Sequence, residues 1–346
     1  MRMLIPSNRL KWLPSDVRLA HEYCFFLHDE MVRMLVEFEQ AEAHKVNLVF
    51  KDPRERRRFE ELLNTSDVLS ALRSMGRHGE AHRAVINTIM LAMVADCGHH
   101  IYEALRCFEK GKIVPGFNLL RKPLLDNLVY FTWMLADEDG FHAAFTSGDP
   151  NKITQKVVGN KRKELLKTAV DLAELAEVID ADDLHATLFE ADSDGLYGLF
   201  QHAVHLVTTQ NAELKTLPEN FNFIFQKPAD PETYRTLYTY LPAVLLYLTL
   251  AVMVLYERIS PIQQGTRSAL LFRAINGYRL LLGPPLSRVV IDAMNEALGA
   301  RVKCPACSAG LKVSPRNAAQ LLLADSFLCN VCRRKQYFPF SWTFGK

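Results

Sequence analysis

The chain has 346 residues, of which 49% are hydrophobic and 23% charged, the composition of a globular protein with a sizeable core. This balance excludes a disordered chain, a collagen-like chain and a small disulfide-stapled protein, and the length predicts one large domain with a smaller module. The net charge of +2 hides an uneven distribution, because residues 301–346 carry eight basic residues and one acidic residue, Asp325. The first 300 residues carry 33 basic and 38 acidic residues, a net of −5, so we predict an acidic body with a basic tail.

Apolar residues recur at helical spacing through most of the first 300 residues. Over residues 84–108, for example, Ile86, Met90, Val94, Cys97 and Ile101 follow one another at intervals of three or four. The same pattern predicts further helices over residues 16–45, 117–135, 153–178, 234–259, 268–282 and 284–299. The charged stretch 51–58 is predicted to interrupt this pattern. We therefore predict an all-α fold, a multi-helix bundle over residues 1–300 with a small module over residues 301–346.

One segment raises the question of a membrane span. Residues 236–256 form a segment without a charged side chain that is long enough to cross a bilayer. The segment also includes Pro242, three threonines and four tyrosines. We predict a buried central helix without membrane contact, and a single span is the alternative. The N-terminus has no apolar signal-peptide region, and Cys24, Cys97 and Cys107 fit no disulfide framework. These features predict a cytoplasmic protein.

Two CxxC pairs near the C-terminus predict a metal site. Cys304 and Cys307 are separated from Cys329 and Cys332 by 21 residues. Four thiolates in two such turns satisfy the tetrahedral preference of zinc and leave no open coordination position, so we predict one structural zinc ion per chain. The pattern resembles a zinc ribbon over about 40 residues, and the alternative is two unrelated pairs of buried thiols.

Basic and aromatic side chains surround the second CxxC pair. Arg333, Arg334 and Lys335 directly follow the last cysteine and are predicted to contact nucleic acid, because cations suit phosphates and aromatic rings suit bases. Further residues of both kinds are Lys303, Lys312, Arg316, Tyr337, Phe338 and Trp342. The alternative is a basic module that docks on its own acidic body or only remains soluble.

An R-x4-H pattern near residue 80 is the first candidate for catalysis. Arg73 with His78 and Arg77 with His82 both match it, and this resembles the motif of HEPN-type ribonucleases. The resemblance implies metal-independent RNA cleavage at a homodimer interface, with Arg77 and His82 as the catalytic residues, in a protein of bacterial antiviral defence. The alternative is that Gly76 and Gly79 form a loop at a helix start whose basic side chains are only solvated.

A second candidate cluster lies on the predicted helix 117–135. Its LLRKPLLDN sequence, with YGLFQHAVH further on, resembles uncharacterised bacterial all-helical proteins with an LLRxPLLE-type helix, from which no activity follows. Arg121, Asp126 and His205 are then a possible catalytic pocket, with a bracing polar network as the alternative. We also expect Lys122 to pair with Asp126 and Pro123 to kink the helix.

These patterns lead to two functional hypotheses. The first is a cytoplasmic nucleic-acid-associated protein of bacterial defence, with a zinc ribbon that contacts RNA or DNA and a HEPN-like body. If the chain is an enzyme, this predicts a metal-independent ribonuclease. The second is a non-enzymatic adaptor or regulator whose ribbon docks on a protein partner.

Overall fold

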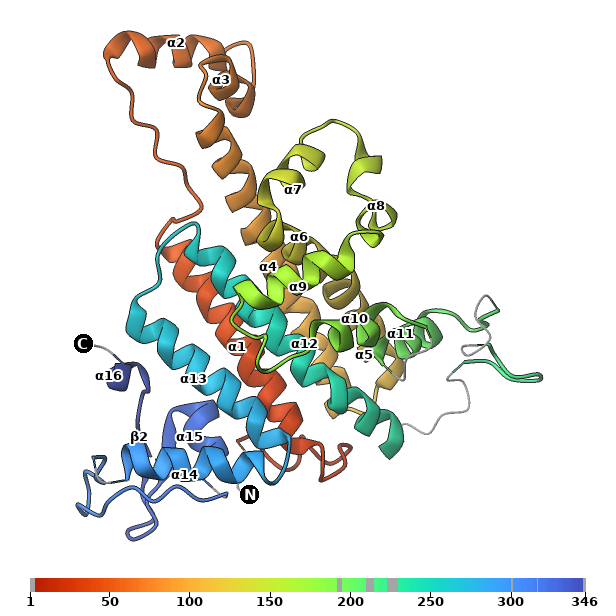
Figure 1. The fold of residues 1–346 in the computed structure, drawn as a ribbon, viewed down its shortest axis with the longest axis vertical. Helices are drawn as coiled ribbons and strands as arrows, with labels where there is room; N and C mark the ends of the chain where they lie inside the picture. The colour runs from red at the N-terminus through yellow and green to blue at the C-terminus, as the bar shows by residue number, and fades with distance from the viewer. Residues whose placement is uncertain are drawn as a thin grey trace.

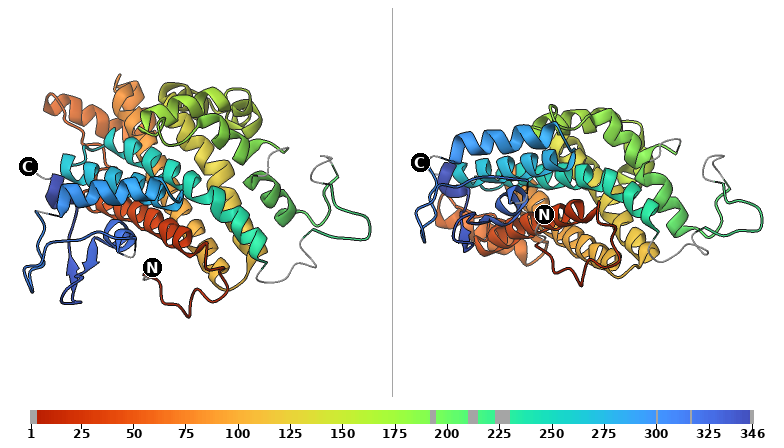
Figure 2. Two further views of the ribbon diagram at one scale, coloured as in Figure 1. Left: turned by 60° about the horizontal axis from the view of Figure 1, so that its bottom comes forward. Right: turned by 90° about the horizontal axis from the view of Figure 1, so that it is seen from below.

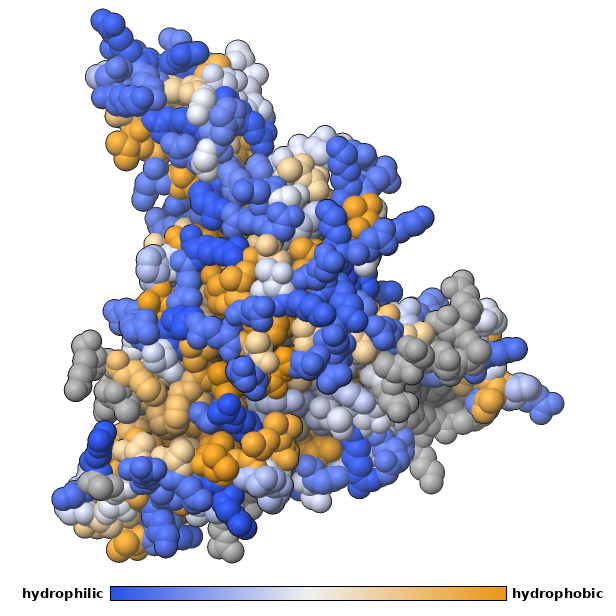
Figure 3. All heavy atoms as spheres, in the orientation of Figure 1, coloured by the Kyte–Doolittle hydropathy of each residue, from blue (hydrophilic) through white to orange (hydrophobic). Residues whose placement is uncertain are grey.

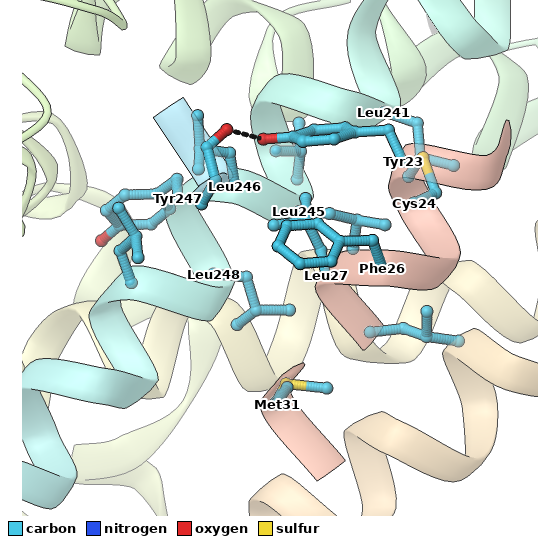
Figure 4. Packing of buried hydrophobic residues seen from close by; sticks show 14 of the residues in the cluster. Tyr23, Cys24, Phe26, Leu27, Met31, Leu241, Leu245, Leu246, Tyr247 and Leu248 are labelled. Carbon is cyan, nitrogen blue, oxygen red and sulfur yellow. Dashed lines mark hydrogen bonds between the residues drawn. The ribbon is translucent and has the colours of Figure 1, made fainter. Parts of the chain in front are cut away.

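The computed structural model describes residues 4–191, 195–209, 215–222, 230–299, 301–315 and 317–344, and helices make up most of this part of the chain (Figure 1). Three long helices form its centre, because α1 (Arg18–Gln40) packs against both α4 (His78–Glu109) and α12 (Pro231–Glu257). Buried residues of α1, including Tyr23, Leu27 and Met31, lie beside buried residues of α12 (Figure 4). The Tyr23 hydroxyl donates to the carbonyl oxygen of Ala274 at 2.7 Å, so its one polar atom is also satisfied.

Helix α12 contains the uncharged segment 236–256. Its N-cap Asp230 accepts a hydrogen bond from the Thr233 backbone N–H at 3.2 Å, and every residue from 244 to 253 is buried. A helix covered on all sides within the protein is typical of a core element. By length and apolarity both α12 and α4 could cross a membrane, with 78% and 44% of their most apolar stretches buried inside the protein. The absence of membrane contact therefore stays a prediction.

Helices α2 (Pro53–Leu63) and α3 (Val68–Ser74) form an arm that projects from one end of the molecule (Figure 1). The expected interruption at residues 51–58 is wrong, because α2 begins there. Asp52 caps it by accepting hydrogen bonds from the backbone N–H groups of Arg54 and Glu55 at 2.7 and 2.9 Å. Mostly hydrophilic residues cover the face of the arm seen in Figure 3. A small separate core connects the arm to the start of α4; it is formed by Phe59, Ala71 and Leu72 of the arm and Ala81 of α4.

The segment predicted as one helix over residues 117–135 consists of three pieces. Helix α5 (Ile113–Arg121) continues into a π-helical turn (Lys122–Asn127) and then into α6 (Leu128–Ala136). Pro123 lies in the first turn of the π-helical piece, where its missing N–H removes one α-helical hydrogen bond. The expected distortion at this proline thus takes the form of a widened turn.

Shorter helices lie beside this centre and cover α6 and α12. The prediction of a single helix over residues 153–178 is wrong. One helix ends at Gly159, and a second helix begins at Arg162 and ends at Leu172. Glycine and asparagine are weak helix formers, and both stand at the break. These elements are α7 (Glu138–Phe145), a 3₁₀ turn (Pro150–Ile153), α8 (Gln155–Gly159), α9 (Arg162–Leu172), α10 (Ala181–Phe189) and α11 (Leu196–Val204).

The C-terminal part begins with two helices that match their predicted positions, α13 (Gln264–Leu281) and α14 (Leu286–Leu298). Helix α15 (Ala318–Ala324), strands β1 (Ser326–Leu328) and β2 (Lys335–Tyr337), and helix α16 (Ser341–Phe344) follow. The strands pair antiparallel, with Phe327 opposite Gln336. The strands and their neighbouring loops extend from one side of the helical body (Figure 2). The predicted fold class, an all-α bundle with a small C-terminal four-cysteine module, is confirmed.

Candidate metal centre and its basic surface

The four C-terminal cysteines converge on one point. Their sulfur atoms all lie within 4.8 Å of one another, with 3.7 Å between Cys304 and Cys332 and 3.6 Å between Cys307 and Cys329. A disulfide would need about 2.05 Å, so the four thiols are separate groups. Cys304 and Cys329 are buried, Cys332 is half-buried, and Cys307 is exposed at the mouth of the cluster.

Each pair of cysteines lies in a tight hairpin turn. The first turn connects the bridged residues Lys303 and Gly310, and the second connects β1 with β2. Both turns use the same backbone hydrogen bonds. Ser308 N–H donates to the Cys304 carbonyl at 2.8 Å, and Arg333 N–H donates to the Cys329 carbonyl at 3.0 Å. The two CxxC segments are therefore one structural motif used twice.

Ser308 and Arg333 also share an unusual backbone conformation, with a φ of 60° at each. This left-handed region costs a residue with a Cβ about 1–2 kcal/mol. Each residue directly follows the second cysteine of its pair, where the chain must reverse to keep both sulfurs on one side. The local strain is thus part of the geometry that gathers the sulfurs.

The backbone of the second turn favours a thiolate. The backbone N–H groups of Cys332 and Val331 face the Cys329 sulfur and lower the pKa of this thiol. Metal binding needs deprotonated cysteines, so this arrangement helps to prepare a ligand.

The cluster has the dimensions of a tetrahedral metal site. Four sulfurs about 2.3 Å from a central ion would be about 3.8 Å apart, close to the two separations given above. Four thiolates would fill the coordination shell, so the arrangement suits a structural ion and offers no position for a substrate. The sequence therefore identified four residues that lie at metal-binding distance from one another.

The cysteine-bearing segment shares its core with the helical body. Leu311, Val313 and Phe340 belong to the same continuous cluster of buried residues as α1 and α12. Helices α15 and α16 both pack against α13, and Phe272 of α13 lies 5.1 Å from the ring of Phe340. The division at residue 300 marks a change in structure type and stays a prediction as a domain boundary.

The surface of this segment is strongly basic. Its single acidic residue, Asp325, is turned toward the body and lies 3.0 Å from Arg273. Six basic side chains are exposed and form no ion pair within the described part of the chain: Arg301, Lys303, Lys312, Arg333, Arg334 and Lys335. Tyr337 on β2 is 69% exposed. Arg316 and the side chain of Trp342 lie outside the described residues.

Arg77 and His82 bind different partners. Arg77 lies 3.1 Å from Glu55 of the arm and 3.2 Å from Glu80, and its guanidinium covers the ring of Phe50. These contacts connect α2 to the start of α4. His82 points instead to Glu138, with Nε2 3.0 Å from the carboxylate.

His82 also stacks on a second imidazole that the sequence analysis did not single out. The rings of His82 and His142 are 3.9 Å apart and nearly parallel. Burial lowers the pKa of both, and the neighbouring Arg83 adds to the effect. The two histidines are 60 residues apart in the sequence and lie on different helices. Their contact depends on how these helices pack, which no local sequence pattern predicts.

Arg121 and Asp126 lie close enough to interact, whereas His205 has no contact with them among the described residues. Burial raises the pKa of Asp126, and the charge of Arg121 opposes that shift. His205 is exposed at the end of α11, and its carbonyl accepts a hydrogen bond from Asn222 at 2.6 Å. The expected pair of Lys122 with Asp126 is wrong, because Lys122 Nζ lies 2.7 Å from Asp96.

Comparison of the chain with known protein families, curated proteins and solved structures identifies no similar protein. No family model matches the chain, and no curated protein and no solved structure is significantly similar to it. The resemblances to a zinc ribbon, to HEPN-type ribonucleases and to proteins with an LLRxPLLE-type helix therefore rest on this chain's residues alone.

Proposed function

We propose that the four cysteines bind one structural zinc ion per chain and that the surrounding ribbon binds nucleic acid. The all-thiolate donor set and the sulfur separations support zinc, because a closed tetrahedral site is what this ion prefers in a structural role. We assign the protein to the cytoplasm, where cysteines remain reduced and available to a metal.

The observation that carries the nucleic-acid proposal is the set of six exposed basic side chains in the cysteine-bearing segment that have no ion-pair partner among the residues the structure describes. Cations without internal partners suit the phosphates of RNA or DNA, whose neutralisation releases bound counterions. The exposed ring of Tyr337 on the neighbouring strand supports stacking with a base. Within the described residues none of these six side chains forms an ion pair with the acidic body, which favours an external partner over docking on the body.

A salt titration tests this proposal. Affinity for a fluorescent single-stranded RNA and DNA should fall steeply with salt, with a slope set by the number of phosphates contacted. Alanine at Arg333, Arg334 and Lys335 should flatten the slope without changing zinc content. Alanine at Arg54, Arg57 and Arg58 is the matched control, because these are also exposed arginines without an ion pair in the described chain.

Undetectable binding to both nucleic acids at low salt would overturn the proposal and favour the adaptor hypothesis. In an adaptor the same basic surface would bind an acidic protein.

The ribonuclease hypothesis for the body is tested separately. The contacts of Arg77 and His82 support a bracing role, since each has acidic partners of its own. A chain in which both His78 and His82 are replaced by alanine should therefore have the same effect on RNA as the original chain. Loss of an RNA-cleaving activity with retained helical content would instead support a HEPN-like body and a place in antiviral defence.

A further inference from the structure

A hollow of about 510 Å³ opens beside the second cysteine pair. The residues that line it include Lys312, Ser314, Asn317, Leu328, Asn330 and Arg333. Its volume is within the range of about 300–1,000 Å³ that is typical of small-ligand sites. It therefore differs from a flat charged surface, which could hold only phosphates.

Internal hydrogen bonds fix the walls of this hollow. The buried Asn317 accepts from Ser314 N–H at 2.7 Å and donates to the Lys312 carbonyl at 2.9 Å. Asn330, which also lines the hollow, donates to the same carbonyl, also at 2.9 Å. The backbone of Lys312 thus holds Asn317 and Asn330 in place, and the hollow keeps its shape without a ligand.

Three polar groups of the hollow are left to contact a ligand. Within the described chain, no partner binds the Lys312 ammonium, the Arg333 guanidinium or the Asn330 side-chain carbonyl. The first is a point charge suited to a phosphate, and the second is a planar cation that can stack on a base. The third is an acceptor suited to the amino or imino group on a base edge.

The position of Arg333 depends on the metal turn. Its left-handed backbone, with a φ of 60°, follows directly from the reversal after Cys332. Its N–H is held by the Cys329 carbonyl at 3.0 Å. The strained and hydrogen-bonded backbone therefore fixes where the Arg333 side chain lines the hollow. Backbone strain of this kind is common at binding sites.

We infer that this hollow binds one unstacked nucleotide of a single-stranded nucleic acid. The phosphate lies at Lys312, and the base lies between Leu328 and the guanidinium of Arg333, with its edge toward Asn330. A duplex keeps its bases stacked inside and offers only phosphates here, whereas a single strand can turn one base outward. The inference rests on the proposed function and names its substrate class.

Fluorescence anisotropy with the full zinc-loaded chain tests the inference. The probes are a labelled single-stranded 12-mer, as RNA and as DNA, and the blunt duplex of the same sequence. We expect binding of at least one single strand to be about tenfold tighter than binding of the duplex, as loss of one base contact would predict. Adenosine monophosphate should displace the strand at a lower concentration than inorganic phosphate.

Two variants separate the hollow from the general charge. Asn330→Leu removes the acceptor without changing charge, and Lys312→Ala removes one charge inside the hollow. Lys335→Ala is the matched control, because it removes one exposed charge on β2 outside the hollow. We expect both hollow variants to weaken single-strand binding about tenfold and duplex binding less than twofold, and the control to weaken both equally.

The outcomes distinguish the inference from the proposed function. Equal affinity for single strand and duplex, or hollow variants that behave like Lys335→Ala, would overturn the inference and leave nucleic-acid binding in place. Displacement by adenosine monophosphate and phosphate at equal concentrations would show that the hollow holds only a phosphate, which also overturns it. No binding of the original chain to any probe would overturn both.

Discussion

Arg273 of α13 and Asp325, the residue after α15, form an ion pair of 3.0 Å that joins the metal-binding segment to the helical body. Arg273 is buried, lies over the ring of Phe26, and bonds to Glu30 of α1 at 2.9 Å and to the Leu322 carbonyl at 2.7 Å. Asp325 receives a hydrogen bond from the Phe340 N–H at 3.2 Å. One guanidinium thus connects α1, α13 and the chain on both sides of the β1–β2 hairpin.

Replacing Arg273 should destabilise the whole chain. Arg273→Met keeps most of the side-chain volume but removes one of the two arginines that bind the buried Glu30 and also removes the ion-pair partner of Asp325, which should cost about 1–3 kcal/mol. Urea unfolding followed by circular dichroism measures this loss. Arg288→Met, at an exposed position of α14, is the control and should change the free energy of unfolding by less than about 0.5 kcal/mol. Equal midpoints for the two variants would contradict the bracing role.

Loss of the metal should reach beyond residues 301–346. Cys304→Ser should abolish stoichiometric zinc by elemental analysis and lower the unfolding midpoint of the whole chain, because Leu311 and Val313 are part of the main core. Far-ultraviolet circular dichroism should change little, since the long helices lie elsewhere. Cys107→Ser, at a cysteine outside the cluster, should keep both the zinc and the midpoint. An unchanged midpoint in Cys304→Ser would show that the segment contributes nothing to the body.

Periodicity predicted the long helices because each buries a continuous apolar face. Residues 84–108 lie within α4, and the predicted helix 234–259 lies within α12 as far as Glu257; in both, local spacing and tertiary burial agree. The apolar periodicity did not predict the capped helix that begins within residues 51–58, because this stretch is rich in charged side chains. Over residues 153–178 it predicted one helix, whereas a helix ends at Gly159. In both places a local backbone effect outweighed the apolar pattern.

The metal ligands were predictable because their chemistry is encoded in a short spacing. The hollow was not, since it depends on how Asn317 and Asn330 meet at the carbonyl of Lys312. The pair formed by Arg273 and Asp325 joins residues 52 positions apart, and nothing local marks either as a partner. One sequence reveals sites built from local motifs and leaves unmarked those built by tertiary packing.

The stacked imidazoles of His82 and His142 should make stability depend on pH. Burial and the charge of Arg83 lower both pKa values, so both rings are harder to protonate in the folded protein than in the unfolded chain. Below about pH 6.5 these histidines bind protons more readily in the unfolded chain than in the folded chain. The free energy of unfolding should therefore fall from pH 7 to pH 5. His142→Phe keeps an aromatic ring against His82 and should reduce that loss. An equally steep loss in thermal unfolding of both proteins would contradict this.

The buried helix α12 predicts that the protein needs no membrane. Its ten consecutive buried residues already contact other parts of the chain, so insertion would require the core to open. We expect the full chain to remain in the aqueous fraction without detergent after cell lysis and ultracentrifugation. A chain that stays in the membrane pellet after an alkaline carbonate wash would support the alternative of a transmembrane span, for which α12 and α4 are both long enough.

Glu109 should be the main acid-sensitive group of the body. Burial alone would raise its pKa, but hydrogen bonds from His21 and Arg9 lower it to about 2. Its carboxylate accepts from Arg9 at 2.6 and 3.0 Å and lies 3.3 Å from His21, whose other nitrogen contacts Tyr238. The group therefore joins α1, α4, α12 and the chain before α1.

Because the folded pKa lies below the usual value of about 4.3, the stability from Glu109 is present above that pH and is lost as the pH falls toward 2. Glu109→Gln should lower the free energy of unfolding at pH 7 by about 3 kcal/mol, since it removes the charge whose interactions in the folded protein lower the pKa of Glu109 to about 2. The difference from the original chain should shrink steadily between pH 5 and pH 2 in urea titrations. Glu103→Gln, exposed on the same helix, should match the original chain throughout. A difference that stays constant over this range would show that Glu109 acts by packing and not by charge.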